Sequence, residues 1–357
     1  MKVGIFSDVA ESRSGGPDNI MYNLVDQLCS LDHGHDIVLL HTSQGDSDIY
    51  DGRDDMQIPE NPARSALKLR SEGFDVVHFD SVAKQESLVY PFLLDAALVA
   101  TQYGDVHFAD ADIRPQSRRQ ILEKRWAQRV ASRFLDTVMP ISESAKQNLS
   151  KGIPADKMEV VYPGLDRIFE DVEVLPREER SPFLFNVSNL NARKNPAALL
   201  GAYERLVADG YDHDLKIAGK NWNEDVLAAH MDDAAAMDRV ELLGKIPVDE
   251  VKEYYKRCMV YLAPTRHEGF GLTPLEAMAC GTPVVSNGVY AVPEVVGDAG
   301  LLVDDPDDVD GFTDAVERLL DDKELWATLS EKGQERAQEF TWEESARTVV
   351  NIYERVA

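Results

Sequence analysis

The 357-residue sequence predicts an α/β protein of two domains, each built on a doubly wound parallel sheet. Short apolar runs alternate with helical patterns from residue 2 onward, the alternation stops over 169–182, and it begins again at Phe183. Strands separated by helices form parallel sheets with right-handed crossovers. We therefore expect domains over 1–168 and 183–341, joined by a linker over 169–182 that is charged and carries two prolines.

In the first half, apolar runs of four to six residues predict strands over 2–6, 36–41, 75–79, 97–101, 137–140 and 158–162. Ile20, Leu24 and Leu28 recur at helical spacing and predict a helix over 19–31. A further helix is expected to begin after Ser142.

In the second half, the same reasoning predicts strands over 183–187, 215–218, 240–243, 260–263, 284–286 and 300–303. Helices are expected over 196–206, 274–279, 308–320 and 323–340. A last helix, over 342–357, is expected to pack back on the first domain. Two such sheets place a ligand-binding cleft at the carboxyl ends of their strands.

The chain is strongly acidic, with 64 Asp and Glu against 37 Lys and Arg and a formal charge of -27. Such a field repels polyanions, so a nucleic-acid partner is not expected. Because concentrated salt screens this self-repulsion, we interpret the acidity as an adaptation of a halophilic organism.

The sequence also indicates a reducing compartment. Cys29, Cys258 and Cys280 are far apart and form no CxxC pair, so neither disulfides nor a zinc site are predicted. No run approaches the ~18 apolar residues of a membrane span, and the first residues read as a strand rather than as a signal peptide. We expect a cytoplasmic protein, with peripheral contact at the inner face of the cell membrane.

Candidate functional residues are most concentrated in the segment 264–286, PTRHEGFGLTPLEAMACGTPVVS. It follows a predicted strand with Gly269, Phe270 and Gly271, whose backbone can approach a ligand closely. Thr273 and Pro274 are expected to cap and begin a helix. The free N–H groups and positive dipole end of such a helix suit a diphosphate.

Two carboxylates and two cations complete the predicted site. Glu268 precedes the glycine turn, and Glu276 follows it with seven residues between them. Arg193 and Lys194 lie in NLNARKN, after the strand 183–187, where paired cations can stabilise a leaving diphosphate as a metal does elsewhere. No metal or cofactor is therefore predicted, and the DxD-like triplet at 110–112, which follows no strand, is interpreted as chance.

Gly15 and Gly16 follow the first strand and let the loop approach a ligand. They do not form GxGxxG, and no acidic residue ends the second strand at the usual distance, so a nicotinamide-dependent dehydrogenase is disfavoured.

The order SGG, PISES, YPGLD, NLNARKN, AGK, LLGKI, EGFGLTPLEAMACGTPVVS and VPEVVGDAGLLVD resembles family 4 glycosyltransferases of the GT-B fold over nearly the whole chain. The resemblance implies a retaining, metal-independent transfer of a hexose from a nucleotide-diphosphate sugar to a glycan or polyprenyl-phosphate-linked acceptor.

The resemblance also implies residue roles. Glu276 would hold the ribose and Glu268 the donor sugar, and Arg193 with Lys194 would complete the catalytic set. The donor-binding residues would be Gly15, Gly16, Gly219, Ile246, Gly269, Phe270, Gly271, Leu272 and Thr273.

One position departs from the family pattern. Family members often carry a His-Asp pair after the strand matching 97–101, but here Gly104 stands where His is expected, before Asp105. His107 is the candidate substitute. The missing His leaves a catalytically silent nucleotide-sugar sensor or scaffold as an alternative, and a GT-B-fold epimerase as another.

The segment 114–133 carries seven basic residues and one acidic residue, with apolar residues at helical spacing. A basic amphipathic helix of this kind suits an anionic membrane or a lipid phosphate. We assign Arg118, Arg119, Arg125 and Trp126 to acceptor or membrane contact. The alternative, which the sequence leaves open, is a core-packing helix whose arginines pair with the protein's own acidic residues.

Overall fold

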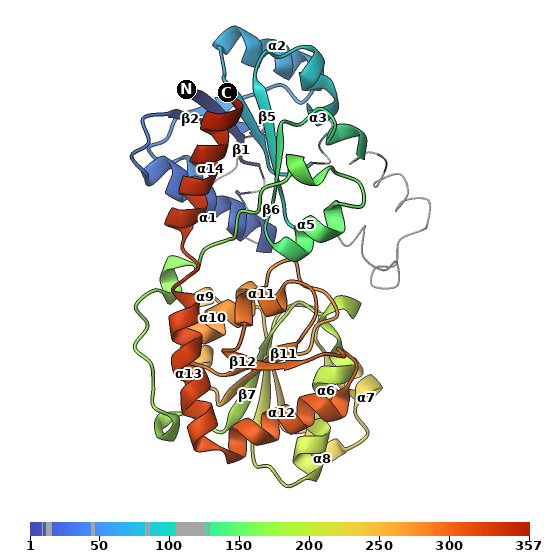
Figure 1. Cartoon of the computed structure of the whole chain (residues 1–357). Helices are drawn as coiled ribbons and strands as arrows, with labels where there is room; N and C mark the ends of the chain where they lie inside the picture. Colours follow the sequence, from blue (N-terminus) through green and yellow to red (C-terminus); the bar gives the residue numbers. More distant parts are fainter. Residues whose placement is uncertain are drawn as a thin grey trace. The chain divides into compact units, whose positions relative to one another are not determined.

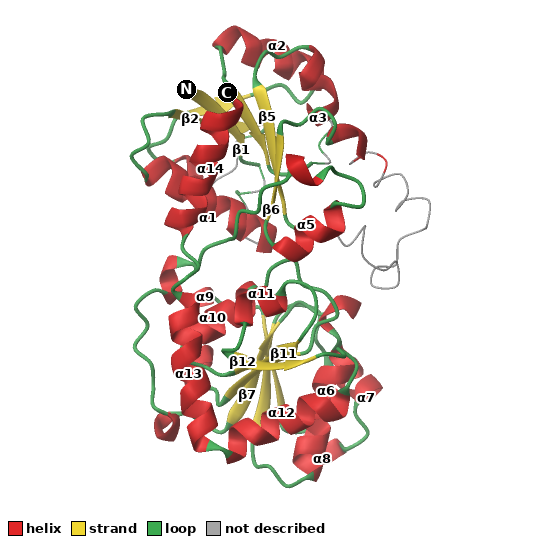
Figure 2. Ribbon diagram, in the orientation of Figure 1, coloured by secondary structure: helices red, strands yellow, loops and turns green. Residues whose placement is uncertain are grey.

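The computed structural model describes residues 1–8, 10–11, 16–43, 47–82, 84, 86–104, 126 and 129–357. The chain divides into two compact units, the first formed by Met1–Gly164 and Thr341–Ala357 and the second by Leu165–Phe340. Figure 1 follows the chain through both, and Figure 2 shows a sheet flanked by helices in each. The predicted pair of α/β domains with parallel sheets is confirmed.

The first unit contains a six-stranded sheet in the order β3-β2-β1-β4-β5-β6, with every pairing parallel. Its strands are β1 (Lys2–Phe6), β2 (Asp36–His41), β3 (Asp55–Gln57), β4 (Val76–Phe79), β5 (Ala97–Gln102) and β6 (Thr137–Pro140). The order reverses between β1 and β4, which is the topological switch point of a doubly wound sheet.

The helices of the first unit are α1 (Gly16–Ser30), α2 (Pro62–Glu72), α3 (Glu86–Val89), α5 (Glu143–Leu149) and α14 (Trp342–Val356). α14 packs against α1, although more than 300 residues separate them in the chain. The Tyr353 hydroxyl on α14 lies 2.6 Å from Nδ1 of His78 on β4, whose Nε2 lies 2.8 Å from the Thr101 hydroxyl. The last helix is thus part of the first unit.

The second unit repeats the strand order of the first, as β12-β11-β10-β7-β8-β9, again entirely parallel. Its strands are β7 (Phe183–Val187), β8 (Asp214–Ala218), β9 (Val240–Gly244), β10 (Val260–Ala263), β11 (Val284–Asn287) and β12 (Gly300–Val303). The switch point lies between β7 and β10.

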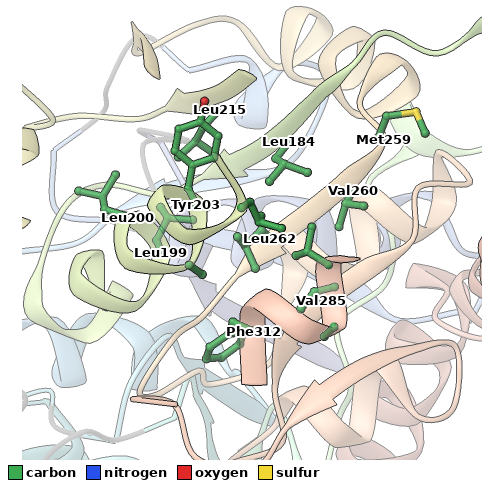
Figure 3. Packing of buried hydrophobic residues seen from close by; sticks show 14 of the residues in the cluster. Leu184, Leu199, Leu200, Tyr203, Leu215, Met259, Val260, Leu262, Val285 and Phe312 are labelled. Carbon is green, nitrogen blue, oxygen red and sulfur yellow. The ribbon is translucent and has the colours of Figure 1, made fainter. Parts of the chain in front are cut away.

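The helices of the second unit are α6 (Pro196–Ala208), α7 (Glu224–His230), α8 (Ala234–Met237), α9 (Val248–Arg257), α10 (Leu272–Ala279), α11 (Val292–Val296), α12 (Val309–Asp321) and α13 (Lys323–Ala337). Leu199 and Tyr203 of α6 and Phe312 of α12 pack with Leu184 and Leu262 of the sheet in one buried cluster (Figure 3). Burying such side chains contributes roughly 1.5–3 kcal/mol each, and this core fixes the strands that carry the site.

The segment predicted as a linker, 169–182, lies within the second unit and is partly buried. The Phe169 ring packs 6.0 Å from that of Tyr255. The guanidinium of Arg180 donates to the carbonyls of Tyr255, Cys258, Cys280 and Gly281, which end α9 and α10. A charged, proline-containing sequence therefore joins the core, because helix ends supply acceptors for its arginine.

Three local expectations differ from the structure. β3 was not predicted, because three residues with one apolar side chain give no strand pattern. The run 158–162 makes only an isolated bridge between Met158 and Val138 rather than a strand. α10 begins at Leu272 with Gly271 as its N-cap, so Thr273 is not the cap and Pro274 is the third helical residue.

Candidate functional site

The candidate site of the second unit is built on the loops that follow β7 and β10, the adjacent strands at the switch point. In doubly wound sheets the two loops at this position diverge, and ligands bind between them at the carboxyl edge. The loop after β7 carries Arg193 and Lys194, and the loop after β10 carries Glu268. The cation pair and the carboxylate, which the sequence predicted as separate groups, therefore lie on neighbouring loops.

The loop after β7 holds its cations in a short 3-10 helix, η7 (Ala192–Lys194). Asn191 caps it by accepting a hydrogen bond from the Arg193 N–H at 3.1 Å. Asn195 then adopts a left-handed conformation with φ of 50° and is fully buried. Its Nδ2 donates to the carbonyl of Pro306 at 2.5 Å and to the Asp307 carboxylate at 3.1 Å. These contacts fix the direction in which the cations leave the loop.

The two loops are joined through the backbone of Arg193. Its carbonyl accepts hydrogen bonds from the Arg266 N–H at 2.8 Å and from the Thr265 hydroxyl at 2.9 Å. The Arg193 guanidinium in turn donates to the carbonyl of His267 at 2.8 Å. The position of the cations relative to Glu268 is thus set by main-chain contacts and not only by side-chain attraction.

Glu268 binds both cations. Its Oε2 lies 3.0 Å from the Arg193 guanidinium, and its Oε1 accepts from Lys194. The three side chains are largely buried, with Glu268 only 13% exposed. Burial opposes ionisation, but Lys194 and Arg193 outweigh it and lower the pKa of Glu268 to about 2. The cluster keeps two positive charges and one negative charge in a fixed arrangement.

α10 begins close to this cluster in the sequence, because only three residues separate Glu268 from Leu272. Gly271 has φ of 119°, a conformation that L side chains rarely adopt, and it caps the helix without a side-chain hydrogen bond. The first N–H groups of a helix have no intrahelical acceptor, and they favour anions. Leu272 and Thr273 are half-buried at this end.

Glu276 lies one turn further along α10. Burial raises its pKa to about 8, and the neighbouring Asp166 adds to this. The Tyr255 hydroxyl, 3.2 Å from Oε2, and Lys194 favour the charged form but do not compensate. A carboxyl group with a pKa near neutrality is typical of a functional position.

The remaining predicted donor residues of the second unit have mixed surroundings. Phe270 is buried, with its ring 5.5 Å from that of Phe340, so its backbone rather than its ring is available to a ligand. Gly269 is half-buried beside it, and Ile246 is half-buried in the loop after β9. Gly219 follows β8, where a Cβ atom would stand 1.9 Å from the Ser188 carbonyl oxygen. That close approach gives Gly219 a packing reason for being glycine.

In the first unit, the structure describes fewer of the predicted site residues. Gly16 is the exposed first residue of α1 and has open space around it. Gly15, His107, Arg118, Arg119 and Arg125 lie outside the described residues, as does Asp105. Trp126 is described and is 67% exposed. His78 on β4 is buried between Thr101 and Tyr353.

Sequence reasoning missed the residues that support the site from behind. Tyr255 contacts Glu276 from α9, and Asn195 and Asp307 hold the cation loop. Tyr255 belongs to a helix whose sequence reads as amphipathic, so its hydroxyl gave no signal. Asn195 was detectable in principle, because Asn before Pro at a helix start favours a special backbone conformation.

Comparison with known proteins relates the chain to glycosyltransferases. A family model described as glycosyl transferases group 1 matches residues 168–336, and one described as glycosyltransferase family 4 matches residues 14–168. The chain is 27% identical over 306 residues to O-antigen chain mannosyltransferase B of Escherichia coli, covering 82% of this chain and 77% of that protein. It is 28% identical over 382 residues to a phosphatidyl-myo-inositol mannosyltransferase of Mycolicibacterium smegmatis, covering 100% and 94%.

Among solved structures, sucrose-phosphate synthase from Thermosynechococcus elongatus matches with a TM-score of 0.79 at 20% identity, over 99% of this chain and 98% of that chain. Two Rossmann-like units of this kind define the GT-B fold. Together the two family models match residues 14–336, and they support a glycosyltransferase with a second half of the group 1 type and a first half of the family 4 type. It is a hexosyltransferase enzyme.

Proposed function

We propose that the protein transfers a hexose from a UDP- or GDP-type sugar to a glycan or lipid-linked acceptor, with retention of anomeric configuration and without a catalytic metal. The observation that carries the proposal is the convergence of Arg193 and Lys194 on Glu268 from the two loops at the switch point. This arrangement supplies positive charge where a diphosphate leaving group develops negative charge.

We propose that each chemical group of the donor binds a separate part of the second unit. The diphosphate is proposed to bind the N–H groups at the start of α10 together with Arg193 and Lys194. Glu276 is proposed to accept hydrogen bonds from the ribose hydroxyls, and the loop around Ile246 to lie near the base. Glu268 forms ion pairs with both cations and is proposed to contact the donor sugar.

The reaction breaks the bond between the anomeric carbon and the diphosphate oxygen. The two cations stabilise the charge that collects on that oxygen, and this electrostatic assistance takes the place of a metal ion. The acceptor hydroxyl oxygen then bonds to the same face of the anomeric carbon. Its proton passes to the departing phosphate oxygen, so the products are the glycoside and the nucleoside diphosphate.

An acceptor held at a membrane surface is supported by the first unit. Phe92 and Trp126 are 70% and 67% exposed, and the Phe92 ring lies 5.2 Å from that of Phe134. Arg129 and Arg133 are exposed in the neighbouring sequence. Aromatic side chains among cations favour an anionic lipid interface. Within the described residues, every helix is too short or too polar to cross a membrane.

Sedimentation with vesicles tests the membrane contact. Vesicles containing an anionic lipid are expected to carry the protein down at moderate salt, and neutral vesicles are not. Reversing the charge of Arg118, Arg119 and Arg125, or replacing Trp126 by Ser, should weaken the binding. Equal recovery with both vesicle types would remove this part of the proposal.

The transferase proposal is tested by nucleotide release from a panel of UDP- and GDP-sugars in concentrated KCl. Slow hydrolysis of one donor class, lost in Glu268→Ala and Arg193→Ala, is the expected result, and it names the donor. Tight binding of one nucleotide without turnover, with lipid-phosphate and glycan acceptors added, would instead indicate a nucleotide-sugar sensor.

A further inference from the structure

The first unit contains a second group of polar side chains at a switch point, at the carboxyl ends of β1, β4 and β5. We call Asp8, Asp80, Lys84 and Tyr103 the carboxyl-edge cluster. Lys84 Nζ lies 3.1 Å from Oδ1 of Asp80 and 4.0 Å from Oδ2 of Asp8. Asp8 is further held by the backbone N–H of Thr42, which donates to its Oδ1 at 2.9 Å.

Within the described residues, two side chains of this cluster are buried with hydrogen bonds left unmade, although Asp80 is ion-paired with Lys84. The side chain of Asp80 is completely buried, and neither of its oxygens receives a hydrogen bond of regular geometry in the described part of the chain. The Tyr103 hydroxyl is likewise buried and unpartnered there. A buried polar group left without a partner costs roughly 1–3 kcal/mol. A bound ligand is one kind of partner that completes such hydrogen bonds.

The charge of the cluster shows which ligand chemistry fits. Lys84 is its one cation within the described residues, and it already faces two carboxylates. Glu11 adds a further acid close by, accepting from the Tyr50 hydroxyl at 2.6 Å, and Tyr50 also lies 3.1 Å from the Ser7 hydroxyl of this edge. The second unit has the opposite balance, with Arg193 and Lys194 against Glu268. A phosphate group is therefore disfavoured at the carboxyl-edge cluster.

Uncharged hydroxyl groups satisfy what the cluster lacks. A carboxylate only accepts hydrogen bonds, and a phenol both donates and accepts them, so together they match the hydroxyls of a sugar. Burial raises the pKa of Asp80 and Lys84 lowers it, and either protonation state of the carboxyl group bonds to a hydroxyl. The switch point is also the expected ligand position in a doubly wound sheet.

We propose that Asp80 and Tyr103 bind hydroxyl groups of an uncharged sugar at the reacting end of the acceptor. This inference rests on the proposed transferase function and narrows it. The group that receives the hexose is then the sugar end of a glycan or lipid-linked glycan, and a bare lipid phosphate is not the nucleophile.

The first test compares acceptors once a donor has been found. Methyl α- and β-glycosides of mannose, glucose, galactose and N-acetylglucosamine are offered at high concentration, alongside farnesyl phosphate. We expect transfer to at least one glycoside and none to farnesyl phosphate. Transfer to farnesyl phosphate, or donor hydrolysis without transfer to any glycoside, would overturn the inference. Absence of donor hydrolysis would instead show that the underlying transferase proposal has failed.

The second test uses Tyr103→Phe and Asp80→Asn. We expect each variant to raise the KM for the glycoside at least tenfold while donor hydrolysis stays within twofold of wild type. Because the Tyr103 hydroxyl has no described partner, its loss should leave the unfolding temperature unchanged or higher. A KM unchanged in Tyr103→Phe would contradict the assignment even if Asp80→Asn fails to fold.

A matched control is Tyr90→Phe. Its hydroxyl is also buried but lies 2.8 Å from that of Ser65 in the core. This variant is expected to lose stability and to keep the KM for the glycoside. The two Tyr→Phe changes should thus give opposite patterns of stability and acceptor affinity, which a purely structural role for Tyr103 would not produce.

Discussion

The Tyr255 hydroxyl lies 3.2 Å from Oε2 of Glu276, and this contact joins α9 to the carboxyl group proposed to hold the ribose. Tyr255 is completely buried, and its ring packs edge-on against Phe185 and Tyr261. It therefore cannot turn away from Glu276 without disturbing the core. The nucleotide site is thus connected to the packing of the sheet.

The pKa of Glu276, about 8, predicts that nucleotide affinity depends on pH. Below pH 8 the free protein holds Glu276 protonated, and above it the carboxylate is formed. Because hydrogen bonds from ribose hydroxyls to a carboxylate are the stronger ones, affinity for UDP or GDP should increase roughly tenfold as the pH rises through 8. Calorimetric titration between pH 6.5 and 9.5 measures this, and proton release near pH 7 is read from buffers of different ionisation enthalpy.

Two variants separate the contributions to this pH dependence. Glu276→Gln should bind weakly at every pH, without the transition. Tyr255→Phe should move the transition to higher pH, because the hydroxyl bond that favours the charged form is lost. A wild-type affinity that is flat across this range would refute the role given to Glu276.

The ion pairs of Glu268 predict a contribution to stability with a defined acid limit. Its pKa is lowered from 4.5 to about 2, so the contribution is fully present above pH 4.5 and is lost as the pH falls through 2. At roughly 1.4 kcal/mol for each pKa unit, it amounts to at most roughly 3.5 kcal/mol. Urea unfolding should show the difference between wild type and Glu268→Gln shrinking as the pH is lowered from 5 to 3.

Glu241→Gln is the control for this prediction. Glu241 pairs with Lys216 at the surface and is 52% exposed, so its loss should cost no more than about 1 kcal/mol. If the two variants lose the same stability at neutral pH, the cluster around Glu268 is not the stabilising arrangement described here.

We predict that replacing Arg180 strongly destabilises the protein without acting directly on the transfer reaction. Its guanidinium donates to four carbonyls at the ends of α9 and α10, to the Thr282 hydroxyl and to the carbonyl of Leu175. It also stacks 4.9 Å from the Trp326 ring. Arg180→Met leaves these acceptors buried and unpaired, which should lower the free energy of unfolding by at least about 3 kcal/mol.

Thermal unfolding followed by circular dichroism measures the effect of Arg180→Met. The control is Arg205→Met, because Arg205 is 47% exposed and pairs with Asp310 at the surface. The control should unfold within a few degrees of wild type. A similarly small change in Arg180→Met would mean that the segment 169–182 does not hold the second unit together.

Gly219 and Gly210 form a matched pair of glycines with positive φ, 141° and 92°. Alanine is strained at both, but only at Gly219 would the new Cβ atom collide with a backbone oxygen, 1.9 Å away. Gly210→Ala should cost about 1 kcal/mol, and Gly219→Ala should prevent folding or shift the end of β8. Expression and unfolding temperature compare them, and equal behaviour would contradict the close approach of β8 to Ser188.

Much of the fold followed from apolar periodicity. The strands of the second unit and α14 were predicted to within about one residue, because buried parallel strands read as continuous apolar runs. β3 escaped because it is a short edge strand with one apolar residue. The start of α10 was misplaced because Thr-Pro is a frequent helix beginning, whereas Gly271 in its left-handed conformation caps this helix two residues earlier.

The residues of the site could be predicted from the sequence, but the ion pairs between them could not. The sequence indicated Arg193, Lys194 and Glu268 by their positions after strands, and the switch point brings them together. Their mutual ion pairs could not be read from the sequence, because they depend on the hydrogen bonds that join the two loops. The interpretation of the acidic composition as salt adaptation stays a prediction, tested by unfolding in low salt and in concentrated KCl.

Release of nucleoside diphosphate by Lys194→Met, in EDTA, tests the central claim most directly. Wild type should turn over its donor undiminished by the chelator, and Lys194→Met should be slower by at least 100-fold. Lys332→Met, at an exposed lysine on α13 that pairs with Asp298, should match wild type. Wild-type activity abolished by EDTA, or Lys194→Met as active as Lys332→Met, would contradict metal-free catalysis by the cation pair.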